Sequence, residues 1–209
     1  MQVTVHLPQE HLPKDHPLAL RIRDRFLPGR ELLTVTRGSD DLPVAQCYEN
    51  VRSVVVTRGG RPQLGWCLSH FPNKFVEALH HAVWEDPNGN LVDVTAPAYQ
   101  TMKGNEITFI PDNSTELSAI DPQVPSWFIQ LDVSSATKGY IRATRERKIF
   151  ANRILDILAA SDVRLYQSAG QIATRDPIPS SLSISVQALQ NSIAEMDTKR
   201  HSYASVLRR

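Results

Sequence analysis

Three residue types that can share one nucleophilic reaction follow each other along this sequence: Cys47, His81 and Asp93. A cysteine attacks a carbonyl carbon as its thiolate, and an imidazole takes up the proton and later returns it. A carboxylate orients the imidazole and stabilises the imidazolium that forms. Such a set reacts only if the fold brings the three side chains together. The elements that carry them therefore decide whether a site exists.

The histidine and the aspartate lie on two predicted strands that are joined by a tight turn, in the stretch "HHAVWEDPNGNLVDVTA" at 80–96. Proline followed by Asn-Gly at 87–89 suits a type I turn with glycine in the left-handed position. This turn predicts a three-residue hairpin loop with a bulge. With that loop, Asp93 lies opposite Val83 and shares a face of the sheet with His81.

His81 and Asp93 are then diagonal neighbours, with backbones about 7–8 Å apart, a distance that their side chains can bridge. His80 points to the opposite face. A loop of two or four residues would pair His80 with Asp93 instead, because a slip of one residue turns every side chain to the other face. The turn chemistry favours His81 as the base and leaves His80 as the alternative.

Cys47 is expected in the opening turns of a short helix that runs from about Pro43 to Gly59. Ser39, Asp40 and Asp41 supply N-cap chemistry, and proline suits a first helical turn. The positive end of the helix dipole favours a thiolate at such a position. The sequence therefore predicts a reactive cysteine facing the histidine strand.

The rest of the chain predicts an α+β fold in three parts. Residues 1–38 form a strand and helix segment, 39–135 form the α+β core with the Cys-His-Asp site, and 136–209 form a helical region. Within the core, the apolar alternation of 62–111 predicts an antiparallel meander of about four strands. The predicted elements are strands at 3–7, 32–38, 63–71, 75–85, 91–96 and 106–111, and helices at 16–27, 43–58, 138–160 and 182–207.

The last predicted helix carries an apolar seam at Val186, Leu189, Ile193 and Met196. Alternating steps of three and four residues are typical of a helix packing face. Packing within the chain is the first interpretation, and a homodimer contact through this C-terminal helix is the alternative.

Composition narrows the function classes. The chain has 209 residues, 41% hydrophobic and 22% charged, and a formal net charge of +1. This composition is that of an ordered globular protein, and the small net charge gives no reason to expect nucleic acid as a partner. No apolar run reaches the roughly 18 residues that a membrane span needs, and no secretory signal is evident, so we expect a cytoplasmic protein without membrane contact.

The order cysteine, histidine, aspartate resembles the transglutaminase-like and papain-like cysteine hydrolase superfamily. The matching residues are "HAVW" (His81–Trp84), "PNG" (Pro87–Gly89) and "DVT" (Asp93–Thr95), and the resemblance covers roughly 39–111. The same block is similar to one in bacterial proteins of unassigned function. The resemblance implies a papain-like core and acyl transfer on an amide, isopeptide or glutamine side chain of a protein or peptide, with no cofactor.

Two further interpretations stay open from the residues alone. The chain can be a catalytically inactive interaction module on the same fold. It can also bind zinc through Cys47, Cys67, one histidine and Asp93. Neither Cys-x-x-Cys nor His-x-x-x-His spacing occurs, and adjacent histidines on a strand face opposite ways, so no metal ligand set is predicted. Cys67 lies mid-strand and is expected to pack as a small buried hydrophobic residue.

Overall fold

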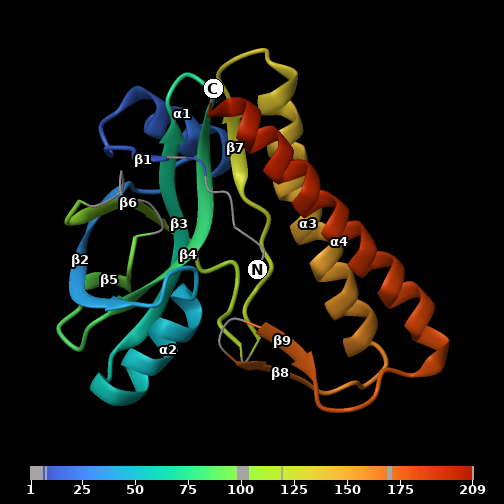
Figure 1. The fold of residues 1–209 in the computed structure, drawn as a ribbon. Helices are drawn as coiled ribbons and strands as arrows, with labels where there is room; N and C mark the ends of the chain where they lie inside the picture. Colours follow the sequence, from blue (N-terminus) through green and yellow to red (C-terminus); the bar gives the residue numbers. More distant parts are fainter. Residues whose placement is uncertain (1–6, 8, 98–103, 119, 169–170, 209) are drawn as a thin grey trace. The chain divides into compact units, whose positions relative to one another are not determined.

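Five strands close on themselves into a small barrel in the computed structural model, which describes residues 7, 9–97, 104–118, 120–168 and 171–208. Closure removes the exposed edges that an open sheet would have. Two short strands extend the sheet beyond the barrel, β1 (Glu10–His11) on β3 and β7 (Trp127–Gln130) on β4 (Figure 1). The barrel strands in spatial order are β3 (Arg61–Phe71), β6 (Glu106–Pro111), β2 (Leu33–Leu42), β5 (Leu91–Thr95) and β4 (Phe75–Glu85), which pairs back to β3.

The hairpin between β4 and β5 has the predicted three-residue loop. The Asp86 N–H donates to the Asn90 carbonyl at 2.9 Å, and Gly89 takes a φ of +88°. Trp84 lies opposite Val92, which is the pairing that the loop length requires. The predicted register of this hairpin is confirmed.

The predicted meander is wrong, because β5 and β6 are not neighbours. β2 lies between them, antiparallel to β6 and parallel to β5, with Arg37 directly opposite Asp93. Residues 32–38 were predicted as a strand of a separate N-terminal segment. Alternation of apolar residues shows that a strand is half-buried but does not say which distant strand it pairs with.

Buried apolar side chains from four of the barrel strands pack together in one cluster: Val35, Cys67, Val83, Ile107 and Phe109. Gly65 permits the close approach of β3 to β6, since a Cβ there would lie 2.2 Å from the Ile110 carbonyl oxygen. The same glycine lies opposite His81 in the pairing of β3 with β4. The barrel therefore holds β4 in place on both sides.

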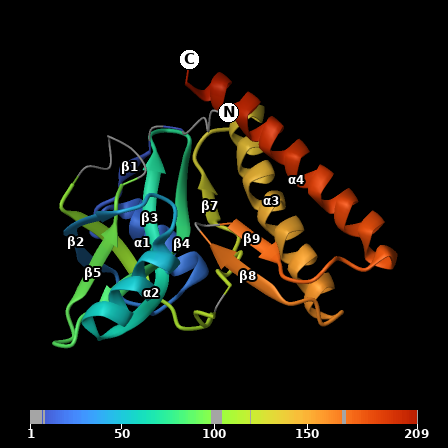
Figure 2. The ribbon, with the colours of Figure 1, turned by 60° about the horizontal axis from the view of Figure 1, so that its bottom comes forward.

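Helix α2 (Cys47–Arg58) packs on the face of β3, β4 and β5 that carries Leu64, Ala82 and Val94 (Figure 2). The helix begins at Cys47 and not near Pro43. The predicted N-cap residues 39–41 belong to β2, and Gln46 occupies the N-cap without a side-chain hydrogen bond. The N-cap prediction is wrong because pairing with β5 extends β2 through Leu42.

The described residues of 8–121 and 127–132 form one compact unit, and those of 1–7, 122–126 and 133–209 form a second. The first unit also contains α1 (Pro17–Phe26), close to its predicted bounds. The predicted strand at 3–7 lies almost wholly outside the described residues.

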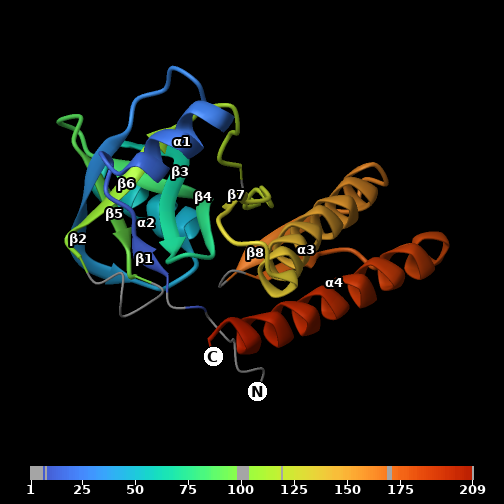
Figure 3. The same ribbon diagram turned by 90° about the horizontal axis from the view of Figure 1, so that it is seen from above.

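The second unit consists mainly of two long helices, α3 (Ser135–Ala159) and α4 (Ser180–Leu207), which run side by side (Figure 3). They are joined through a hairpin that the sequence analysis did not predict, β8 (Leu165–Ser168) with β9 (Gln171–Thr174). Val186 of the predicted seam packs on Leu158, and Arg147 pairs with Asp197 at 2.9 Å. At Val186 the seam therefore packs within the chain, as the first interpretation has it.

In the part of the chain that the structure describes, the fold is α+β with four helices and a mostly antiparallel sheet. None of the described helices has both the length and the apolar character needed to cross a membrane.

Candidate functional site

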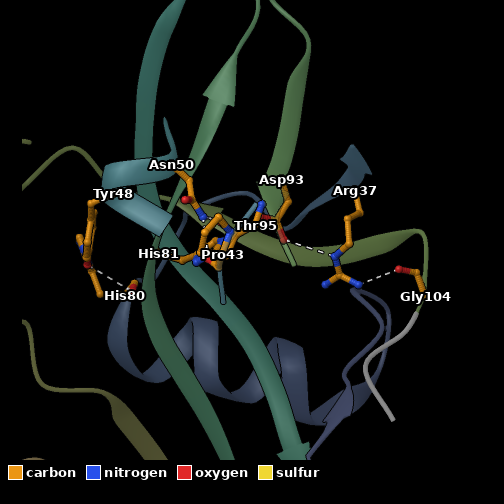
Figure 4. A network of polar contacts seen from close by, with 9 residues as sticks. All are labelled: Arg37, Pro43, Tyr48, Asn50, His80, His81, Asp93, Thr95 and Gly104. Carbon is orange, nitrogen blue, oxygen red and sulfur yellow. Dashed lines mark hydrogen bonds and ion pairs between the residues drawn. The ribbon is translucent and has the colours of Figure 1, made fainter. Parts of the chain in front are cut away.

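His81 and Asp93 form a buried pair at the centre of the site (Figure 4). Nε2 of His81 lies 3.0 Å from Oδ1 of Asp93. The two side chains are 11% and 4% exposed. β4 and β5 bring them together through the hairpin register, as the sequence predicts, so the imidazole is held by a carboxylate on the adjacent strand.

Asp93 is held at both carboxylate oxygens. Oδ1 also accepts the main-chain N–H of Thr95 at 3.1 Å. Oδ2 lies 3.6 Å from Nε of Arg37, an ion-pair distance and too long for a hydrogen bond. The sequence analysis missed Arg37, because its place beside Asp93 depends on the parallel pairing of β2 with β5.

Electrostatics favour the charged forms of this pair. Burial lowers the pKa of His81, but Asp93 and Cys47 outweigh it, and the pKa stands well above its ordinary value. Burial raises the pKa of Asp93, but His81, the Thr95 N–H and Arg37 outweigh it, and the pKa falls below its ordinary value. An imidazolium and a carboxylate are therefore expected to coexist at neutral pH.

Cys47 is the first residue of α2, and it lies close enough to His81 to raise the pKa of the imidazole. It is 9% exposed. The first N–H groups of a helix have no acceptor within the helix, and the positive end of the helix dipole lies there. Both features favour a negatively charged oxygen bound beside the sulfur. Cys47 thus lies beside the His81 ring, whose Nε2 is hydrogen-bonded to Asp93.

His80 takes the opposite face of β4, as predicted. The Tyr48 hydroxyl lies 2.7 Å from its Nδ1, and the two rings are stacked (Figure 4). Trp66 meets the imidazole edge-on with ring centroids 5.0 Å apart. His80 therefore packs under the start of α2, away from the Asp93 carboxylate. It is not placed to act as the alternative base with that acid.

Asn50 fastens the helix start to β5. Its buried amide donates to the Pro43 carbonyl at 2.9 Å and to the Thr95 hydroxyl at 3.0 Å (Figure 4). Thr95 in turn donates its N–H to Asp93. The sequence analysis did not find this role, which links the loop before Cys47 to the strand of Asp93.

Cys67 lies among the buried apolar residues of the barrel, as the sequence predicts. Burial raises its pKa to about 11, so its thiol is neutral at physiological pH. Among the residues that the structure describes, no group of three or more His, Cys, Asp or Glu side chains is arranged to hold a metal ion. The zinc ligand set considered from the sequence is not assembled in this part of the chain.

Comparisons of the chain with protein-family models, with curated proteins and with solved structures found no match. The resemblance to transglutaminase-like and papain-like enzymes therefore stays a prediction from the sequence.

Proposed function

We propose that this chain is a thiol-dependent acyl-transfer enzyme with a papain-like core, in which Cys47 is the nucleophile, His81 the base and Asp93 the orienting acid. One observation carries the proposal: a single imidazole lies beside a cysteine at a helix start and is hydrogen-bonded to a buried carboxylate. Nucleophile, base and orienting group in this order are the arrangement that activates a nucleophile in acyl transfer.

The reaction begins when the Cys47 sulfur attacks the carbonyl carbon of an amide. Nε2 of His81 is bonded to Asp93, so Nδ1 is the nitrogen that takes the thiol proton. His81 then gives this proton to the leaving nitrogen as the C–N bond breaks, and a thioester on Cys47 remains. The main-chain N–H of Cys47, at the positive end of α2, is a donor for the negative oxygen of the intermediate.

The second half of the reaction returns the enzyme to its starting state. Water attacks the thioester in hydrolysis or deamidation, and an amine attacks it in transamidation. In either case His81 takes a proton from the attacking group and returns it to the Cys47 sulfur as the C–S bond breaks. The substrate class is an amide, isopeptide or glutamine side chain on a protein or peptide.

Thiol labelling tests the proposal without a known substrate. Iodoacetamide at about pH 6 is expected to modify Cys47 well before Cys67, because only a thiolate paired with an imidazolium reacts fast at that pH. His81→Ala should slow the labelling of Cys47 by at least about tenfold. Mass spectrometry of tryptic peptides identifies the labelled residue.

Cys67→Ser is the matched control and should leave the rate at Cys47 unchanged. Equal, slow labelling of both cysteines, unaffected by His81→Ala, would reject the enzyme.

One observation favours a second candidate, a catalytically inactive interaction module on the same fold. Counted as whole residues, Cys47 and His81 are each only 9% exposed, which leaves little surface for a substrate to approach. The same experiment separates the two candidates, since an inactive module has no reason to keep a reactive thiolate.

A further inference from the structure

We propose that Arg37 is a positioning residue of this site, which holds Asp93 ionised and turned so that its other carboxylate oxygen meets His81. The inference rests on the proposed function, because it assigns a role within the same Cys47–His81–Asp93 set.

The pairing of β2 with β5 places Arg37 beside Asp93. β2 and β5 run parallel, and Arg37 is the direct partner of Asp93 across them. The guanidinium Nε lies 3.6 Å from Oδ2, while Oδ1 accepts from His81 and from the Thr95 N–H. One carboxylate oxygen thus faces Arg37 and the other faces His81, which determines the rotation of the carboxylate group.

Arg37 is itself anchored. Its Nη1 donates to the Gly104 carbonyl at 2.7 Å (Figure 4). Its main-chain N–H donates to the Asn105 carbonyl at 2.7 Å. The Arg37 side chain is 9% exposed, and that of Asp93 is 4% exposed. A buried charge is costly unless it is paired, so each of these two side chains depends on the other.

The buried charges alternate in sign along the site. The order is Arg37 positive on β2, Asp93 negative on β5 and His81 positive on β4, with Cys47 of α2 beside His81. From β3, Cys67 also faces Asp93 and His81, as a neutral thiol at physiological pH. Arg37 cannot lose its proton, whereas His81 must do so in each cycle. Arg37 therefore keeps Asp93 ionised when His81 is neutral.

The test is the pH profile of iodoacetamide labelling at Cys47, measured on the full chain in a Cys67→Ser background. In Arg37→Met, the acid limb of the profile should shift to higher pH by about one unit, because Asp93 loses the positive charge that favours its ionised form. Arg37→Lys keeps a positive charge and should bring the limb back toward the parent. A residue that only stabilised the fold would not move the limb of the folded protein.

Arg58→Met is the matched control. Arg58 lies on the helix that carries Cys47 and pairs with Asp40 of β2 at 2.8 Å. The Arg58 side chain is 49% exposed and does not contact the site. Its profile should superimpose on the parent profile. If circular dichroism shows that Arg37→Met does not fold, Arg37→Gln, which keeps a donor for Gly104, replaces it with the same expected shift.

The outcomes separate the two proposals. An unchanged limb in the folded Arg37→Met or Arg37→Gln protein, with labelling still dependent on His81, overturns the role of Arg37 and leaves the enzyme standing. Labelling that is independent of His81 overturns the enzyme itself.

Discussion

The Tyr48 hydroxyl lies 2.7 Å from Nδ1 of His80. Tyr48 follows Cys47 on α2 and His80 precedes His81 on β4, so this contact lies next to the one between Cys47 and His81. Two consecutive residues of α2 thus meet two consecutive histidines of β4. One contact belongs to the candidate site, and the other fixes the first turn of the helix against the strand. The position of the sulfur relative to the imidazole depends on both.

Tyr48→Phe should lower the free energy of unfolding by about 1–3 kcal/mol, because it removes the buried hydroxyl that contacts the His80 ring but keeps the stacked ring. Labelling of Cys47 should slow as the helix start loosens. Urea denaturation followed by circular dichroism measures the first effect. Tyr166→Phe, in the second unit, is the matched control because the Tyr166 side chain is 41% exposed. Equal stabilities of Tyr48→Phe and the parent would contradict the anchoring role.

Asp93→Asn should lower the free energy of unfolding and the labelling rate of Cys47 more than Tyr48→Phe does. Removing one partner of a buried ion pair leaves the other charges uncompensated and costs about 3–5 kcal/mol. Asn also fails to stabilise the His81 imidazolium, so labelling of Cys47 at pH 6 should fall by at least about tenfold. Thermal unfolding and labelling rates measure the two effects.

Asp24→Asn serves as the control for this change, since Asp24 is an exposed carboxylate paired with Arg23 at the surface. An exposed pair contributes about 0–1 kcal/mol, so this variant should behave like the parent. If the two variants lost the same stability, Asp93 would have no special role.

The stability of the parent relative to His81→Gln should depend on pH in a defined sense. The pKa of His81 is raised by folding, so its contribution is complete below the unfolded value of 6.5 and is lost as pH rises through the folded value. The pKa of Asp93 is lowered by folding, so its contribution is complete above the unfolded value of 3.8 and is lost as pH falls through the folded value.

Both contributions are therefore complete between pH 3.8 and 6.5. The difference in unfolding free energy between the parent and His81→Gln should be largest in this window and should shrink above neutral pH. Urea midpoints measured from pH 4 to 10 check the sign. A difference that grows with alkaline pH would mean that His81 is not held as an imidazolium.

Gly139→Ala tests the packing of the second unit. A Cβ at this position would lie 2.3 Å from the Tyr203 ring, so either the ring or the two helices must shift. Overpacking of this kind costs about 1–3 kcal/mol. Thermal unfolding should show the loss, and adding Tyr203→Leu should recover part of it. No recovery in the double variant would place the strain elsewhere.

The hairpin that carries His81 and Asp93 could be predicted from residues that are close together in the sequence. The turn at 87–89 and the alternation of β4 and β5 are set by neighbours in sequence, and the pair they bring together is twelve residues apart. The helices α1, α3 and α4 also follow from their own periodicity. For these elements the sequence was sufficient, because backbone geometry and side-chain direction depend on residues close along the chain.

Tertiary structure alone decided the rest of the site. The parallel pairing of β2 with β5 brought Arg37 to Asp93, moved residues 39–41 from the expected helix cap into a strand, and started α2 at Cys47. It also closed the barrel that replaces the expected meander. Each of these contacts joins segments that are far apart in sequence. Such pairings follow from which apolar faces can be buried together, and a single periodic pattern does not report that choice.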